Sequence, residues 1–187
     1  TLEFGIGNSG KRGVMDQDAP ASAQIQTEVP CTDHADAVYR IFDLLGTSES
    51  TAAVKAGEID IVGHRVVHGG SRFSKPVIIT DDVLAELTSL AELAPLHIPL
   101  NVMCVRACRQ ILPDAPMAAC FDTAFSHGMP PESMLYPVPM EWHETYGIRR
   151  YGFHGISYEY VAAEAARQLA APLERLRIIA AHLGNGC

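Results

Sequence analysis

Short apolar runs alternate with amphipathic runs along this chain, and this alternation constrains its fold more than any other feature. An apolar, β-branched stretch occurs at residues 59–68, and shorter apolar stretches occur at 77–80 and 117–121. Between them, residues 81–93 and 99–111 carry apolar side chains at helical spacing. Buried strands that alternate with helices predict an α/β architecture with a central sheet and flanking helices.

Helix caps and turn residues predict the elements around this alternating region. Thr32 or Asp33 caps an amphipathic helix that Gly46 ends, because a short polar side chain there accepts a hydrogen bond from the first turn. Thr80 caps a later helix in the same way. Residues 1–31 mix glycines with short polar stretches, a pattern typical of short strands and turns.

A second α/β unit is predicted after a proline-rich segment. Residues 129–139 hold four prolines, so we expect a linker there. The alanine-rich run at residues 155–171 predicts a helix whose apolar face includes Val161 and Leu169. Residues 176–182 are largely apolar and run into a glycine turn, which predicts a strand.

Composition limits the classes of function. The 187 residues are 48% hydrophobic and 19% charged, which suffices for the core of one domain or two small ones. The formal charge of -8 is spread along the chain, so no basic stripe is expected to bind nucleic acid. No apolar run of about 18 residues and no secretory signal pattern occur, so we expect neither a membrane span nor export.

The five cysteines lack the paired Cys-x-x-Cys spacing of a disulfide or metal framework. An odd number of thiols without such spacing suits a reducing compartment. We therefore expect a cytoplasmic protein whose thiols are mostly buried.

The segment HRVVHGG at residues 64–70 contains the first candidate site residue. In a regular strand, Arg65 and Val67 share one face, and His64 and His68 share the other. A buried guanidinium needs a partner, so Arg65 is either an anion clamp or the partner of a structural carboxylate. For the two histidines, packed or hydrogen-bonded roles are favoured over metal ligation, because no further ligand stands at recognisable spacing.

Two further segments place a titratable side chain in a loop. In residues 93–101, which begin with LAPLH at 93–97, Pro95 and Pro99 bracket His97 in a stiffened loop, although an ordinary surface histidine would look the same. In FDTAF at residues 121–125, Asp122 directly follows a short apolar strand. A carboxylate at such a strand end holds Mg²⁺ or a reacting group, or it caps a helix or turn.

Two glycine-rich segments complete the set. In YGFHG at residues 151–155, glycines flank His154 just before a helix, where the imidazole can face an anion. In HLGNG at residues 182–186, a strand is expected to lead into a glycine turn whose N–H groups can approach phosphate. An ordinary hairpin is the alternative for this last segment.

Taken in order, these five motifs resemble the acetate kinase (acetokinase) family, and the resemblance covers roughly residues 59–187. It implies the ribonuclease H-like α/β fold of the sugar kinase, Hsc70 and actin superfamily, with a mixed central sheet and flanking helices. The implied domains are residues 1–128, without the family's first strand, a linker region at 129–150, and the start of a second ribonuclease H-like domain at 151–187.

The resemblance implies a role for each motif. Arg65 binds the substrate carboxylate or the transferring phosphate, and Asp122 helps to place Mg²⁺ and the reacting acetate. His97, His154 and His182 contact the phosphoryl group or the nucleotide phosphates. The implied acetyl pocket, which would admit a methyl or ethyl group, consists of Val67, Leu96 and Phe153, and the implied ATP-phosphate loop consists of His182, Gly184, Asn185 and Gly186.

The implied reaction is a reversible phosphoryl transfer between ATP and acetate that yields acetyl phosphate and ADP. Mg²⁺ (or Mn²⁺) is the implied cofactor, and a homodimer is the implied assembly. Phosphoryl transfer depends on positioning and on positive charge around the equatorial oxygens. Arg65 and His154 are the expected sources of that charge, with Asp122 as the third catalytic residue.

This chain also departs from the family's usual pattern. Residues 98–101 read Ile-Pro-Leu-Asn where Asn-Pro-Pro-Asn is usual. Ser126 replaces a histidine after FDTAF, and residues 156–158 read Ile-Ser-Tyr where threonine, serine and histidine are usual. We expect altered local hydrogen bonds at these positions.

The chain opens at Thr1 and closes directly after the glycine turn, which predicts a piece of a longer protein. Because family motifs expected before and after these residues are not found, the chain is expected to be inactive alone. The alternatives are a butyrate or propionate kinase, and a non-catalytic anion-binding fragment.

Overall fold

The computed structural model describes residues 2–5, 24–27, 30–46 and 56–184. These residues form two compact units, Thr1–Val62 with Met103–Pro116, and Gly63–Val102 with Met117–Cys187. The domain bounds expected at residues 128 and 150 divide the chain at other positions than these two units do. They remain a prediction. No helix in the described ranges is long and apolar enough to cross a membrane.

The first unit contains an antiparallel pair of strands and a capped helix. β1 (Leu2–Gly5) pairs with β2 (Gln24–Thr27) in an antiparallel register, which confirms short strands near the N-terminus, whereas residues 6–23 lie outside the described residues. α1 (His34–Gly46) begins as predicted, because the Asp33 carboxylate accepts a hydrogen bond from the Asp36 N–H at 2.8 Å.

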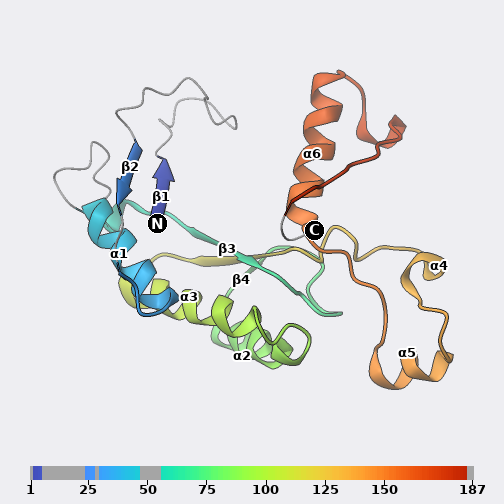
Figure 1. Cartoon of the computed structure of the whole chain (residues 1–187), viewed down its shortest axis with the longest axis horizontal. Coiled ribbons are helices and arrows are strands. Elements are labelled where there is room, and N and C mark those ends of the chain that lie inside the picture. Colours follow the sequence, from blue (N-terminus) through green and yellow to red (C-terminus); the bar gives the residue numbers. More distant parts are fainter. Residues whose placement is uncertain (1, 6–23, 28–29, 47–55, 185–187) are drawn as a thin grey trace. The chain divides into compact units, whose positions relative to one another are not determined.

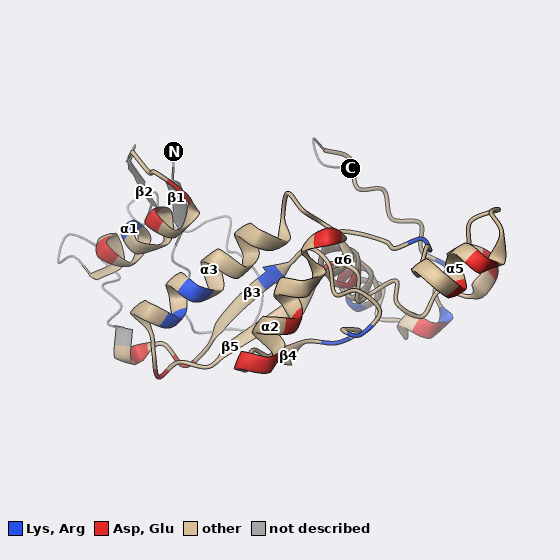
Figure 2. Cartoon of the chain, turned by 90° about the horizontal axis from the view of Figure 1, so that it is seen from below, with Lys and Arg blue, Asp and Glu red and all other residues tan. Residues whose placement is uncertain are grey.

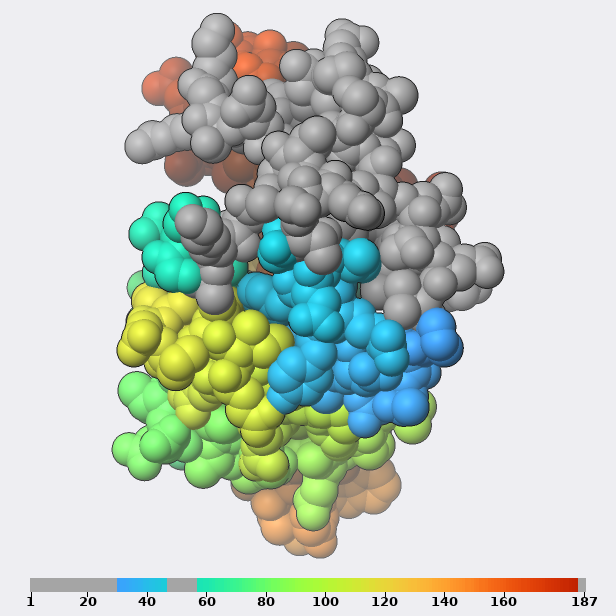
Figure 3. Space-filling model, turned by 90° about the vertical axis from the view of Figure 1, so that its left-hand side faces the viewer, coloured from blue at the N-terminus to red at the C-terminus, as the bar shows by residue number. Residues whose placement is uncertain are grey.

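The later part of α3 (Ile98–Ile111) belongs to the same unit as α1, and η2 (Ala56–Glu58) is a short 3₁₀ turn of that unit. The Tyr39 hydroxyl of α1 donates a hydrogen bond to the Gln110 side chain of α3. Figure 3 shows side chains of α1 next to those at the end of α3. This contact therefore joins two helices that are far apart in the sequence.

The second unit is built on a small mixed sheet. Its strands are β3 (Val62–Val66), β4 (Val77–Ile78) and β5 (Met117–Phe121), in the order β3-β5-β4. β4 is antiparallel to β5. The Val62 N–H donates to Pro116 and the Asp122 N–H donates to Val66, so β3 and β5 advance in the same direction.

The buried strand predicted at residues 59–68 is shorter and less buried than expected. β3 covers five residues, and only Val66 among them is buried. The reason is its position at an edge of the sheet, where one side has no neighbouring strand within the described residues. By contrast, β5 is the central strand, and its alternate residues Met117, Ala119 and Phe121 are buried.

The helices between the strands follow the predicted caps. α2 (Asp81–Ser89) starts after Thr80, whose hydroxyl accepts from the Val83 N–H at 3.2 Å, and it continues into the 3₁₀ turn η3 (Leu90–Glu92). α3 starts beside Pro99 and ends before Pro113. Figure 1 shows α2 and the start of α3 on one side of the strands.

The expected linker region at residues 129–150 carries two short helices, α4 (Pro131–Met134) and α5 (Met140–Tyr146). Prolines precede both helices, at Pro130 and Pro139, where a missing N–H costs nothing. Figure 2 marks acidic residues along the ribbons of α5, α2 and α1 and basic residues along those of α3 and β3.

α6 (Gly155–Gln168) confirms the predicted helix, but its buried side is not the face named from the sequence. Ala162 and Ala166 are buried, whereas Val161 and Leu169 are exposed. α6 contacts β5, and a close approach of helix to strand favours alanine over larger side chains at the contact.

The strand predicted at residues 176–182 is wrong for this structure. After η4 (Leu173–Arg175) the chain runs on without strand pairing, and the side chain of Ile179 is 98% exposed. An apolar run becomes a strand only where a neighbour takes up its backbone hydrogen bonds. No described strand pairs with it here.

The expectation of mostly buried thiols holds in part. Among the described residues, Cys108 is buried, Cys104 and Cys120 are half-buried, and Cys31 is exposed, all as free thiols. Burial raises the pKa of the Cys104 and Cys108 thiols. These two thiols are therefore protonated at neutral pH.

Candidate functional site

An ion pair between Arg65 and Asp122 forms the centre of the candidate site. Arg65 Nε donates to both carboxylate oxygens at 3.0 and 3.1 Å, and Nη2 donates to Oδ2 at 2.7 Å. β3 and β5 are parallel neighbours, so the residues at their carboxyl ends meet at one edge of the sheet. The strand order therefore brings together two motifs that are 57 residues apart.

The burial of this pair differs from the expectation. The Asp122 side chain is 1% exposed, whereas that of Arg65 is 65% exposed, so the predicted buried arginine is wrong. Arg65 projects from an edge strand, where its far end reaches solvent. The hydrogen bond to Asp122 raises the pKa of Arg65 further above its ordinary value, and the guanidinium stays cationic.

This geometry bears on both sequence-based alternatives for these residues. The structural pairing considered for Arg65 is present, and the Asp122 carboxylate accepts from the guanidinium rather than capping a helix or turn. A guanidinium has five N–H donors. Nε and one Nη2 hydrogen are used here, so one Nη2 and two Nη1 donors on the exposed edge remain for an anion.

A second pair lies at the start of α6. His154 Nδ1 and His182 Nδ1 are 3.0 Å apart, and the two rings are edge to face with centroids 4.8 Å apart. A hydrogen bond between two Nδ1 atoms needs one protonated and one bare nitrogen, so one ring donates and the other accepts. His154 also has a left-handed φ of 57°. Residues other than glycine adopt this conformation only where surrounding contacts hold it.

A backbone hydrogen bond connects the segments that carry the two pairs. The Gly155 N–H donates to the Asp122 carbonyl at 2.8 Å, so the residue after His154 is anchored to the residue that holds Arg65. A β-carbon on Gly155 would lie 2.3 Å from that carbonyl oxygen. The last glycine of YGFHG is thus explained by close packing against FDTAF rather than by phosphate binding.

Side chains that sequence reasoning did not assign hold the motif loops together. The Thr123 hydroxyl accepts from the Gly69 N–H at 3.0 Å. The Ser126 hydroxyl accepts from the Gly152 N–H at 2.9 Å and lies 3.1 Å from the Gly152 carbonyl. Ser126 was noted only as a departure from the family, and that departure was the available signal for this bond.

The expected acetyl pocket of Val67, Leu96 and Phe153 is only partly assembled. The Val67 N–H donates to the Asn101 side chain at 3.2 Å, which ties the end of β3 to the first turn of α3. Leu96 is 78% exposed, and His97 is exposed in the turn before α3. Among the described residues, no hydrogen bond, ion pair or ring contact joins Leu96 or His97 to the other candidate residues.

Phe153 is 43% exposed, and its ring lies 5.5 Å from that of His68, the residue after Val67. His68 is buried and hydrogen-bonded, the role favoured for it from the sequence, and His64 lies 3.4 Å from the Met117 sulfur. Of the expected phosphate loop, His182 and Gly184 are described, whereas Asn185 and Gly186 lie outside the described residues.

The described residues do not fit Mg²⁺. Asp122 is the single carboxylate of the candidate site, and Arg65 engages both of its oxygens. Mg²⁺ requires near-octahedral oxygen coordination. Within the described ranges no group of three or more His, Cys, Asp or Glu side chains is placed to hold a metal ion. We therefore derive no step through the metal.

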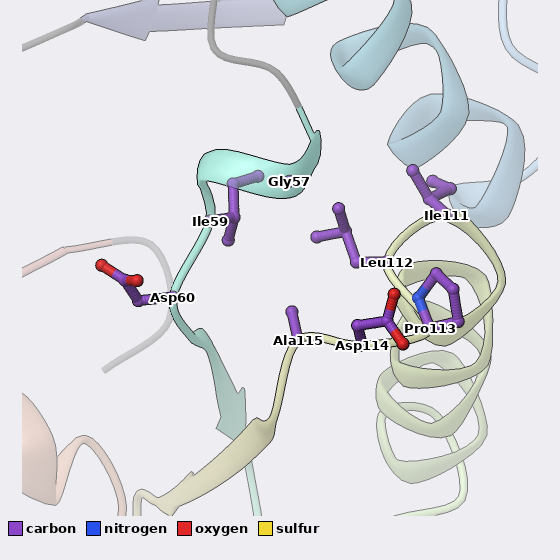
Figure 4. A pocket seen from close by; sticks show the side chains of 8 residues that line it. All are labelled: Gly57, Ile59, Asp60, Ile111, Leu112, Pro113, Asp114 and Ala115. Atoms are coloured by element: carbon purple, nitrogen blue, oxygen red, sulfur yellow. The ribbon is translucent and has the colours of Figure 1, made fainter.

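A cavity of about 340 Å³ in the first unit involves none of these residues. Its lining includes Ile59, Leu112 and Ala115, whose side chains point into the space in Figure 4. The Asp60 carboxylate points away from that space (Figure 4). Because the polar groups do not converge, the cavity supports no assigned ligand.

The fold and the candidate site together define a mixed α/β protein with charged and polar side chains at the carboxyl ends of two parallel strands. The model of the acetokinase family matches residues 8–187, and the chain belongs to that family. The resemblance noted from the five motifs is thereby confirmed.

Named relatives agree with this assignment. The chain is 50% identical over 163 residues to an acetate kinase from Thermoanaerobacterium thermosaccharolyticum. This alignment covers 87% of this chain and 41% of that protein. It is 47% identical over 182 residues to an acetate kinase from Alkaliphilus metalliredigens, with 97% and 45% covered. The chain thus spans less than half the length of these curated relatives.

Solved structures confirm the predicted fold class. The crystal structure of Porphyromonas gingivalis acetate kinase matches with a TM-score of 0.80 and 40% identity, over 87% of this chain and 41% of that one. A propionate kinase from Francisella tularensis matches with a TM-score of 0.70 and 37% identity, over 79% of this chain and 37% of that one.

Proposed function

We propose that this chain carries the carboxylate-binding part of an acetate kinase, which transfers a phosphoryl group reversibly between ATP and acetate. The observation that supports this proposal is the Arg65–Asp122 pair. A buried carboxylate holds a guanidinium whose opposite edge remains exposed with three N–H donors. Such a fork matches the oxygens of a carboxylate or a phosphate.

In the proposed reaction, Arg65 binds the acetate carboxylate or the oxygens of the transferring phosphoryl group. Asp122 fixes the guanidinium plane, which reduces the entropy lost when the anion binds. A fixed positive charge beside the phosphoryl oxygens stabilises the charge that they carry in the transition state. Arg65 and Asp122 therefore act as one positioned unit.

The start of α6 supplies the second set of proposed contacts. His154 stands at the amino end of a 14-residue helix, where the helix dipole favours anions. We assign phosphoryl or nucleotide phosphate contacts to His154, His182 and His97. Gly184, Asn185 and Gly186 are assigned to the ATP phosphates by the same family resemblance.

The proposed acyl pocket consists of Val67, Leu96 and Phe153. Their side chains suit a methyl or ethyl group, and the likeness to a propionate kinase structure supports propionate as a second substrate. A butyrate kinase is the neighbouring alternative, because one methylene changes discrimination by only about 1–3 kcal/mol. Relative rates with acetate, propionate and butyrate separate these candidates.

ATP is the proposed co-substrate, and Mg²⁺ or Mn²⁺ is proposed as its counter-ion. A cytoplasmic location and a homodimer are proposed on the family resemblance alone. Sedimentation velocity at several protein concentrations tests the assembly.

The test combines turnover with binding. The chain is incubated with ATP, Mg²⁺, acetate and hydroxylamine to detect acetyl hydroxamate, and acetyl phosphate binding is measured by calorimetry. Arg65→Ala removes the proposed clamp. Arg72→Ala is the matched control, because Arg72 is also an exposed arginine in an ion pair, with Glu86, and has no proposed role at the site.

Turnover by the wild type and by Arg72→Ala, but not by Arg65→Ala, supports the proposal. Turnover would also correct the expectation that this chain is inactive alone. Arg65-dependent binding of acetyl phosphate without turnover would favour the second candidate, a non-catalytic anion-binding fragment. Equal behaviour of both variants in both assays would overturn the role given to Arg65.

A further inference from the structure

His68 has no role in the proposed reaction, yet it is buried beside the proposed acyl pocket. His68 is 3% exposed. The Gly70 N–H donates a hydrogen bond to the Nδ1 of His68, at 2.8 Å. An Nδ1 that accepts a hydrogen bond is unprotonated. The neutral ring therefore carries its proton on Nε2.

Ring contacts extend from His68 to a second motif. The Tyr151 ring lies edge-on at 4.5 Å between centroids, and the Phe153 ring lies edge-on at 5.5 Å. The Arg149 guanidinium lies 4.8 Å from the centroid of the Tyr151 ring. Edge-to-face rings and a cation over an aromatic face are attractive arrangements. His68 thus joins the turn after β3 to the aromatic residues of YGFHG.

We propose that neutral His68 is a positioning residue for the acyl pocket, which holds the Gly69–Gly70 turn by its Nδ1 and the Phe153 ring by its edge. Phe153 is a pocket residue under the proposed function, on which this inference rests. Val67, the neighbour of His68 in the chain, is another. One side chain therefore sets the spacing between two walls of the pocket.

The positioning role requires the uncharged ring. Protonation of Nδ1 would remove the acceptor for Gly70. Burial lowers the pKa of His68 and so favours the neutral form. The segments packed around His68 carry further charged or titratable groups, namely His64, Arg65, Asp122, Arg149, Arg150, Tyr151 and His154. Arg65 is paired with Asp122, and Arg149 lies over Tyr151.

Two variants separate the two functions of this ring. His68→Asn keeps an acceptor for Gly70 in its Oδ1 and loses the ring, whereas His68→Phe keeps a ring and loses the acceptor. His68→Asn is expected to raise the KM for acetate roughly tenfold, with the KM for ATP unchanged, because Phe153 loses its neighbour. His34→Asn, at an exposed histidine of the first unit, is the control and is expected to change neither constant.

A second measurement does not depend on turnover. Amide hydrogen exchange by NMR reports the Gly70 N–H, and we expect wild-type protection in His68→Asn and exchange roughly tenfold faster in His68→Phe. If the wild type shows no turnover, as expected for this chain alone, Gly70 exchange and the Phe153 ring resonances still test this inference. Wild-type Gly70 protection in His68→Phe, or unshifted Phe153 resonances in His68→Asn, would overturn it.

Discussion

Two parts of the second unit meet at the candidate site, and they are packed differently. In the part formed by residues 63–102 and 117–124, here called the sheet part, the interior contains large side chains such as Leu87, Ile98 and Phe121. In residues 125–184, the C-terminal part, the buried residues are Gly155, Ala162 and Ala166. Large apolar side chains of the C-terminal part are exposed, with Leu183 at 93% and Tyr146 at 72%.

This difference indicates how the site is held. The sheet part supplies Arg65 and Asp122 from strands with a core beneath them. The C-terminal part contributes His154 through contacts with the sheet part, such as the bond from Gly155 to Asp122. A side chain in the sheet part is therefore positioned by buried area, whereas one in the C-terminal part is positioned by a few close contacts.

The largest expected effect tests the packing of the sheet part. Phe121 is 1% exposed and stacks on Phe73 with ring centroids 4.9 Å apart. Phe121→Ala should lower the free energy of unfolding by about 3–5 kcal/mol, because it removes a buried ring and leaves a cavity. Urea unfolding followed by circular dichroism measures this change.

The matched substitution in the C-terminal part is Trp142→Ala, at a side chain that is 46% exposed. We expect a smaller loss than for Phe121→Ala, since nearly half of the Trp142 surface is already in contact with solvent. Equal losses for Trp142→Ala and Phe121→Ala would break the comparison between the two parts.

The next effect concerns the contact that joins the parts. A β-carbon on Gly155 would lie 2.3 Å from the Asp122 carbonyl and 2.8 Å from the Phe125 Cβ. Gly155→Ala should therefore cost about 1–3 kcal/mol in unfolding free energy through overpacking. The same urea titration measures it.

Gly128→Ala is the control for this substitution, because no atom lies within 4 Å of a β-carbon there. It should leave stability unchanged or slightly higher, since alanine reduces the entropy of the unfolded chain. A Gly155→Ala variant as stable as Gly128→Ala would show that the two parts are not in tight contact at this point.

A smaller effect depends on pH. Burial lowers the pKa of His68, so the unfolded chain binds its proton more readily than the folded chain. The stability that His68 contributes as a neutral group is present above its unfolded pKa of about 6.5. It declines as the pH falls through that value towards the folded pKa. The difference in urea midpoint between wild type and His68→Asn should therefore shrink from pH 7.5 to pH 5.5, roughly.

His34→Asn provides the comparison for this pH series, because His34 is exposed. Its midpoints should run parallel to those of the wild type. Parallel curves for His68→Asn as well would mean that His68 does not contribute to the acid side of the stability profile.

The smallest effect is expected on the surface of α6. The hydrogen bond from Arg167, helped by one from Gln168, lowers the pKa of Glu164 from 4.5 to about 2. The stabilisation of the folded state by this pair is present above pH 4.5 and is lost as the pH falls through about 2. Carboxyl NMR titration should place the Glu164 midpoint near 2, and Arg167→Gln should move it towards 4.5.

Arg175→Gln, at an exposed arginine beyond the helix, should leave the Glu164 titration unchanged. Because the Glu164–Arg167 pair lies on the surface of α6, with 67% of the Arg167 side chain exposed, its effect on unfolding should be small and reduced by salt. A wild-type midpoint near 4.5 would show that the pair does not persist in solution.

Local sequence signals predicted the elements that depend on neighbours along the chain. Asp33 and Thr80 are the caps of α1 and α2, because a cap needs only the first helical turn. The strand predicted at residues 176–182 required a partner that no local pattern specifies, and the described structure has none. The five ordered motifs identified the family, whereas neither Thr123 nor Asn101 gave a sequence signal strong enough to assign its role.

By itself, the sequence determined the alternation of strands and helices, the caps, and the residue types present at the site, since these follow from periodicity and side-chain chemistry. The tertiary structure decided that Asp122 is the partner of Arg65 and that His154 faces His182. It also decided that Arg65 is exposed, because that depends on β3 being an edge strand. Pairings between distant segments depend on strand order and on close approach of backbones, which no local window of sequence contains.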